Sequence, residues 1–162
     1  MANVRVLGID PGYGRLGVAI VEKTDGKEKL IFSTCIESSS KEAFVDRLLY
    51  LGQEIEKIIK KFKPEVLAIE KLFFTTNQKT AMNVSEVKGM ITFISRKNGL
   101  KILELTPLEI KNSMVGYGKA DKNQISFMVK KILNLENKKA IDDEFDAIAV
   151  GLTGLVLSRH LL

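Results

Sequence analysis

The sequence predicts an α/β fold in which one mixed five-stranded sheet carries helices on both faces. Three observations predict it. Residues 4–36 alternate short apolar runs with Gly-rich turns, a pattern typical of an antiparallel meander. From residue 44 onward, apolar residues recur at helical spacing. Two further apolar runs are each separated from the preceding strand by a helical pattern, so we expect these strands to run parallel to the first one.

The N-terminal part is predicted to hold three strands joined by tight turns. Val4–Asp10 is a short apolar run typical of a buried strand. Residues 16–21 and 30–36 have the same character, and Asp25-Gly26 between them is a common two-residue hairpin turn. These three strands are therefore expected to form the antiparallel meander.

Helices and strands then alternate along the chain. Apolar residues spaced by three and four predict a long amphipathic helix over Phe44–Phe62. Ser39 and Glu42 fit a capping box at its start. The elements expected after it are the strand Val66–Glu70, the helix Gln78–Lys97, the strand Lys101–Leu105 and three more helices. The first two of these helices begin at capping boxes, formed by Thr106 with Glu109 and by Asp121 with Gln124, and the last begins at Asp142.

The composition is that of one globular domain, which we expect to span residues 1–162. Hydrophobic residues make up 45% and charged residues 28%. A lone Cys35 rules out an intrachain disulfide, and the single histidine, His160, leaves no zinc-binding cluster.

We see neither a signal peptide nor an apolar segment of membrane-spanning length, so we expect a cytoplasmic protein. The net charge of +5 fits a solvated surface and a phosphate-binding face equally well.

Four acidic residues stand where the predicted elements can bring them together. Asp10 and Glu70 each end a buried strand, where a carboxylate is costly unless a positive charge neutralises it. If the two strands are neighbours, both residues lie at the carboxyl edge of the sheet, where open α/β sheets bind ligands. Asp143 and Asp146 are spaced i, i+3 and share one face of the last helix. Four converging carboxylates need a counter-ion, which predicts Mg²⁺ or Mn²⁺.

Three of the four acids also have a purely structural explanation; Asp146, which an apolar run follows, is harder to explain in this way. Asp143 suits a helix start, Asp10 suits an Asx turn, and Glu70 can reach solvent. A metal site explains all of them at once. Two ions about 3.5–4 Å apart would suit phosphodiester hydrolysis.

The glycines of residues 12–17 match a dinucleotide-binding fingerprint, but that motif requires a helix next and a β-like run follows, so we reject it. These glycines instead suit a tight hairpin and the close approach of a phosphate.

The motifs around these acids resemble those of the RuvC family of bacterial Holliday junction resolvases, within the RNase H-like superfamily. The resemblance runs from about residue 4 to about residue 157 and rests on residues 7–17, 68–73, 115–124 and 143–150 in this order. It implies an RNase H-like fold and an endonuclease that makes paired symmetric nicks in four-way DNA junctions. The products would carry 5′-phosphate and 3′-hydroxyl ends, and the activity would serve homologous recombination and DNA repair.

The resemblance also implies roles for single residues. Asp10, Glu70, Asp143 and Asp146 match the catalytic, metal-binding acids, which would hold two Mg²⁺ ions with Mn²⁺ as a substitute; some members have His at the position of Asp143. Lys111 and Lys122 match basic residues that hold DNA, and Phe73 matches an aromatic residue that stacks on bases.

The residues themselves support DNA contacts in the same places. Lys111, Lys119 and Lys122 cluster around a glycine turn, where they suit phosphate binding; a solvated charged loop is the alternative. Phe73 and Phe74 are adjacent, so one is expected in the core and the other exposed for stacking, and the sequence leaves open which.

The resemblance implies three partners: four-way junction DNA, a second copy in a homodimer, and the branch-migration proteins RuvA and RuvB of the same pathway. A two-fold dimer would present two active sites to two symmetric strands. The predicted helix Gln78–Lys97 has a broad apolar face with Met82, Met90 and Phe93, which suits either a dimer interface or a wide core contact. We expect Met82 and Met90 to belong to the core and not to a functional site.

Three rival functions share features of this sequence. Another RNase H-like nuclease, acting on RNA–DNA hybrid or structured RNA, would use the same metal chemistry. An actin-like ATPase or sugar kinase shares the opening strand, Asp and Gly-rich hairpin, but 162 residues do not supply its second lobe. A binding module without activity would be expected to lack at least one of the four acids, and all are present.

Overall fold

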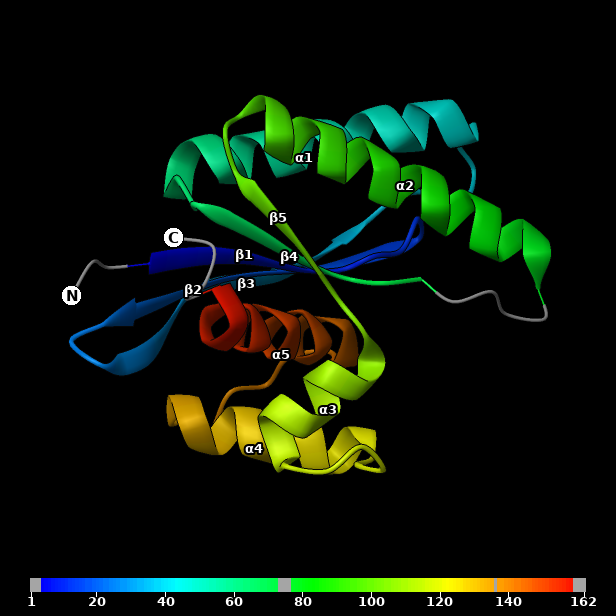
Figure 1. Cartoon of the computed structure of the whole chain (residues 1–162). Helices are drawn as coiled ribbons and strands as arrows, with labels where there is room; N and C mark the ends of the chain where they lie inside the picture. The colour runs from blue at the N-terminus through cyan, green and yellow to red at the C-terminus, as the bar shows by residue number, and fades with distance from the viewer. Residues whose placement is uncertain (1–3, 73–76, 136, 159–162) are drawn as a thin grey trace.

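One mixed sheet organises the protein (Figure 1). The computed structural model describes residues 4–72, 77–135 and 137–158. The strands β1 (Val4–Asp10), β2 (Arg15–Thr24) and β3 (Lys27–Glu37) form an antiparallel meander. β4 (Val66–Glu70) runs parallel to β1, and β5 (Lys101–Leu105) runs parallel to β4, in the order β3-β2-β1-β4-β5. The predicted fold class is confirmed.

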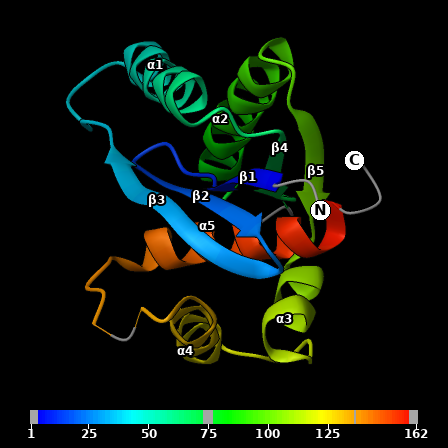
Figure 2. The same ribbon diagram turned by 90° about the vertical axis from the view of Figure 1, so that its left-hand side faces the viewer.

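Helices cover both faces of the sheet. α1 (Phe44–Phe62) and α2 (Gln78–Lys97) lie on one face, and α5 (Asp142–Leu157) lies on the other with α3 (Pro107–Val115) and α4 (Lys122–Leu133) beside it (Figure 2). Each layer buries its own hydrophobic cluster against the sheet. In the described part of the chain, no helix is long and apolar enough to cross a membrane.

Several predicted elements are confirmed to the residue, and two differ. β2 and β3 extend further than expected because their hairpin uses only Asp25 and Gly26, whose φ angles of 52° and 79° suit a tight turn. The capping box predicted at Ser39 and Glu42 is wrong: α1 is capped by Ala43 without a side-chain hydrogen bond. Residues 39–42 form a separate turn instead, in which the Glu42 amide donates to the Ser39 carbonyl at 3.3 Å.

The backbone of α5 lies directly on the first two strands. A Cβ atom added to Gly8 of β1 would overlap the carbonyl oxygen of Ala147, and one added to Gly17 of β2 would overlap that of Asp143. The sequence predicts that a phosphate closely approaches this glycine turn, but at Gly17 the backbone of α5 occupies that space. Because glycine permits this approach, the first turns of α5 are fixed beside the carboxyl end of β1.

Candidate metal and DNA site

Asp10 and Glu70 come together because their strands are neighbours. β1 and β4 pair in parallel, with Ile9 opposite Ile69, and the two acids follow immediately after this pair. The four residues before each acid are buried, whereas both acids are only half-buried. The carboxyl edge of the sheet thus carries two adjacent carboxylates, as the sequence predicted.

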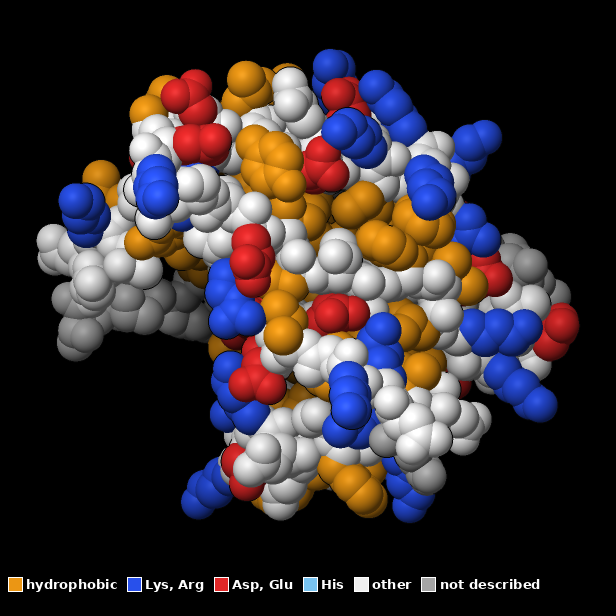
Figure 3. Space-filling view, turned by 180° about the vertical axis from the view of Figure 1, so that it is seen from behind, with side chains coloured by type: hydrophobic (Ala, Val, Ile, Leu, Met, Phe, Trp, Pro, Cys, Tyr) orange, Lys and Arg blue, Asp and Glu red, His pale blue; other side chains and the backbone are white. Residues whose placement is uncertain are grey.

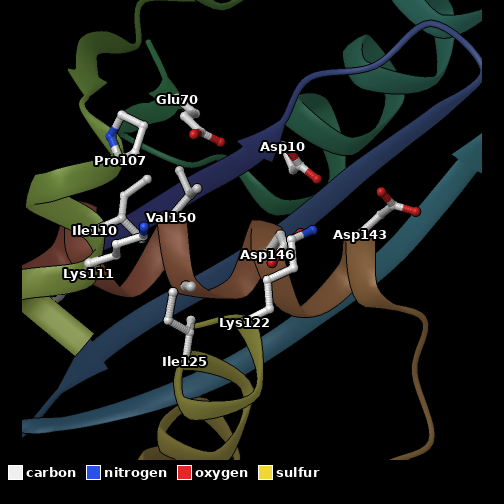
Figure 4. Close-up of a pocket in the computed structure, with 11 residues that line it drawn as sticks. Asp10, Glu70, Pro107, Ile110, Lys111, Lys122, Ile125, Asp143, Asp146 and Val150 are labelled. Carbon is white, nitrogen blue, oxygen red and sulfur yellow. The ribbon is translucent and has the colours of Figure 1, made fainter. Parts of the chain in front are cut away.

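α5 brings the other two acids to the same edge. Asp143 and Asp146 belong to its first turns, one helical turn apart. The four acids share a cavity of about 300 Å³ that two lysines also line (Figure 4). Its lining residues are Asp10, Glu70, Pro107, Ile110, Lys111, Lys122, Ile125, Asp143, Asp146, Ala149 and Val150.

The inner acids, Asp10 and Glu70, are only partly neutralised: burial and the neighbouring acids raise the pKa of both, and this outweighs the charge of Lys122, which lowers it. Burial, together with the charges of Asp146, Glu70 and Asp143, raises the pKa of Asp10 to about 7. Burial and the charge of Asp146 also raise the pKa of Glu70. Within the described residues, neither carboxylate has a Lys or Arg nitrogen within 4 Å. A bound cation would remove this penalty.

Asp143 and Asp146 differ, because each has a basic partner. Lys122 Nζ lies 3.1 Å from Asp146 Oδ2, and Arg15 Nε lies 3.2 Å from Asp143 Oδ2. The hydrogen bond to Asp146 and its charge raise the pKa of Lys122. On the face seen from behind, acidic side chains lie among Lys and Arg side chains across the middle of the molecule (Figure 3). The sequence reasoning missed Arg15; its only signal was a basic residue at the strand start next to the glycine turn.

The donor set fits a hard divalent cation. All four acids offer carboxylate oxygens, the ligands that Mg²⁺ and Mn²⁺ take. Among the described residues, no three acidic, histidine or cysteine side chains are already close enough to hold an ion as they stand. A metal ion that bound through the Oδ2 atoms of Asp143 and Asp146 would displace their basic partners.

The predicted DNA-binding residues differ in their relation to this cavity. Lys111 of α3 and Lys122 of α4 line it. Lys119 is exposed in the loop between these helices and does not line the cavity. Phe73 and Phe74 fall outside the described residues.

Comparison with known proteins identifies the family. The sequence model described as crossover junction endodeoxyribonuclease RuvC matches residues 6–154. The chain belongs to the RuvC family. The RuvC proteins of Caldicellulosiruptor saccharolyticus and Finegoldia magna are each 44% identical to it, over 98% and 96% of this chain and 96% and 95% of theirs. As a member of this family, the protein is a metal-dependent nuclease that hydrolyses DNA.

Solved RuvC structures share the whole fold. Thermus thermophilus RuvC, 27% identical, superposes with a TM-score of 0.87 over 97% of this chain and 96% of its own. The same protein in complex with a Holliday junction substrate gives a TM-score of 0.90 at the same coverage. The RNase H-like fold implied by the sequence motifs is therefore confirmed.

Proposed function

We propose that this RuvC-family nuclease is a Holliday junction resolvase that makes paired symmetric nicks in four-way DNA junctions. The observation that carries the proposal is the cavity in which four carboxylates and two lysines meet at the carboxyl edge of the sheet. A relative with the same fold has been solved with a Holliday junction substrate. The single nuclease domain would act in the cytoplasm, during recombination and repair of DNA.

The acids would hold the metal. Asp10, Glu70, Asp143 and Asp146 are proposed as ligands of two Mg²⁺ ions, with Mn²⁺ as a substitute. When bound, such ions would supply charge neutralisation and Lewis-acid activation of the attacking water. The raised pKa of Asp10 supports this role, because an acid that is half-buried among other acids needs a nearby positive charge.

The lysines would hold the substrate against the acids. Lys122 reaches Asp146 with a side chain that is 77% exposed, so its ammonium group stands at the rim of the cavity, where a scissile phosphate would enter. Lys111 lines the same cavity from α3 and would contact a neighbouring phosphate. Lys119 would bind phosphate further out. Phe73 is proposed to stack on a base near the junction point.

A second copy would dock on α2. Met82 and Phe93 are 65% and 69% exposed on this helix, so the expectation that Met82 belongs to the core is wrong. Met90, by contrast, packs against the core cluster beneath α1 and α2. Large exposed apolar side chains on one helix favour an interface over a core contact. We therefore propose a homodimer through this helix, with RuvA and RuvB as further partners.

The function is tested with three labelled substrates of one sequence: a four-way junction, a linear duplex and an RNA–DNA hybrid, each incubated with Mg²⁺. We expect nicks at symmetric positions in two opposing strands of the junction and no cutting of the duplex or hybrid. Cutting of the hybrid in place of the junction would keep the metal chemistry and overturn the proposed substrate.

A further inference from the structure

Arg15, the first residue of β2, holds one of the four acids. Its Nε lies 3.2 Å from Asp143 Oδ2, and the next carboxylate, Glu37 Oε1, lies at 3.8 Å. The Arg15 side chain is 53% exposed and that of Asp143 is 28% exposed, so this ion pair lies near the protein surface. Arg15 therefore makes its shorter ion pair with an acid of the candidate site.

The backbone on both sides of this ion pair is fixed. Gly17 leaves no room between β2 and the Asp143 carbonyl, so the first turn of α5 lies tightly on the strand. On the other side, buried Arg47 donates to Ser38 Oγ at 2.9 Å and to the Tyr13 carbonyl at 3.3 Å. The turn that precedes Arg15 is thus anchored, and the contact with Asp143 joins two rigid segments.

The same carboxylate would serve a metal ion. Asp143 presents Oδ2 to the Arg15 guanidinium, and an ion held by the four acids would need the oxygen lone pairs of Asp143. An oxygen that accepts from the Arg15 guanidinium is a weaker metal ligand, so Arg15 and an ion that binds through Oδ2 are alternatives at this acid.

We propose that Arg15 is a positioning residue that holds the Asp143 side chain and competes with divalent ions for its Oδ2 atom. The proposal rests on the proposed role of Asp143 as a metal ligand. It assigns Arg15 a part in setting the metal concentration at which the site is completed. Displacement of Arg15 would accompany ion binding, and its loss would tighten that binding.

The test measures Mn²⁺ binding to the protein without DNA, from the electron paramagnetic resonance signal of free Mn²⁺. Four proteins are compared: the parent chain, Arg15→Gln, Asp143→Asn and the double variant. We expect Arg15→Gln to bind Mn²⁺ about two- to fivefold more tightly, the scale of an exposed ion pair. In the Asp143→Asn background the same change should have no effect, because the competition acts through that carboxylate.

Arg96→Gln is the matched control, since it removes the same charge from the exposed C-terminal turn of α2, which precedes β5. Its Mn²⁺ affinity should equal that of the parent chain. Equal tightening by Arg15→Gln with and without Asp143 would overturn the proposal in favour of general charge repulsion. Unchanged affinity would overturn it as well. A parent chain that binds no Mn²⁺ would instead refute the underlying metal site, which makes the two failures distinguishable.

Discussion

Lys122 Nζ lies 3.1 Å from Asp146 Oδ2, so a residue proposed to bind DNA also neutralises a residue proposed to bind metal. The contact joins the first residue of α4 to α5. A capping box of Asp121 and Gln124 fixes where α4 begins and therefore where Lys122 lies. If a cation were to bind Asp146, Lys122 would become available to a phosphate at the same rim.

Replacement of Lys122 should weaken DNA binding in a salt-dependent way. We expect Lys122→Gln to lower the slope of log affinity against log salt by about 1, because one phosphate contact is lost. Fluorescence anisotropy with a labelled four-way junction, in Ca²⁺ to support binding, measures this slope. Lys57→Gln on α1 likewise breaks the ion pair of an exposed lysine, here with Glu54, so it is the control and should leave the slope unchanged. Equal slopes for all three proteins would argue against a phosphate contact by Lys122.

Asp10 should destabilise the metal-free fold as the pH rises. Its pKa is raised from 3.8 to about 7, so the folded state holds the proton more tightly than the unfolded state does. The stability that this proton contributes is complete below about pH 4 and is lost between there and about pH 7. In chelator at pH 8, Asp10→Asn should therefore raise the free energy of unfolding by roughly 2–4 kcal/mol.

Urea unfolding of both proteins from about pH 4 to pH 8 checks this sign. The advantage of Asp10→Asn should shrink steadily as the pH falls. Asp46→Asn, at an exposed position of α1, is the matched control for loss of a carboxylate. An advantage of the same size at every pH would contradict the assigned cause.

The close contact between β1 and α5 should make Gly8 intolerant of a side chain. Gly8→Ala places a Cβ atom against the Ala147 carbonyl oxygen, and we expect it to lower the free energy of unfolding by about 1–3 kcal/mol or more. Gly14→Ala is the control, because its Cβ would lie 3.6 Å from Arg47 Nη2, an ordinary contact. Similar stability of both variants in urea would show that α5 does not lie on the strand in this way.

The proposed interface on α2 predicts a change of oligomeric state. Phe93→Asp should shift the protein from dimer to monomer in sedimentation velocity, because it places a charge in an apolar contact. Val45→Asp on α1 is the matched control, since Val45 and Phe93 are both 69% exposed. Val45→Asp should remain dimeric. A monomeric parent chain, or dissociation by both variants, would exclude α2 as the specific interface.

The sequence predicted the elements and the inner acids because these depend on local patterns. Helical spacing and capping residues defined most helix ends. Asp10 and Glu70 each end a buried strand, so they lie at the same edge of the sheet once the two strands are neighbours. The partners of the acids depend on how distant segments pack. The Arg15–Asp143 pair requires α5 to lie on β2 at Gly17, which no local pattern reveals. The exposure of Met82 likewise follows from the way α2 packs on the sheet.

The most direct test of the proposed catalytic role of the carboxylates compares the parent chain with Asp10→Asn on one labelled four-way junction. Binding is measured in Ca²⁺ and cutting in Mg²⁺. We expect equal binding, paired nicks by the parent chain, and a rate for Asp10→Asn that is lower by at least about a hundredfold, the loss typical for removing one group that stabilises transition-state charge. Full cutting activity of Asp10→Asn would contradict the claim that these carboxylates carry the chemistry.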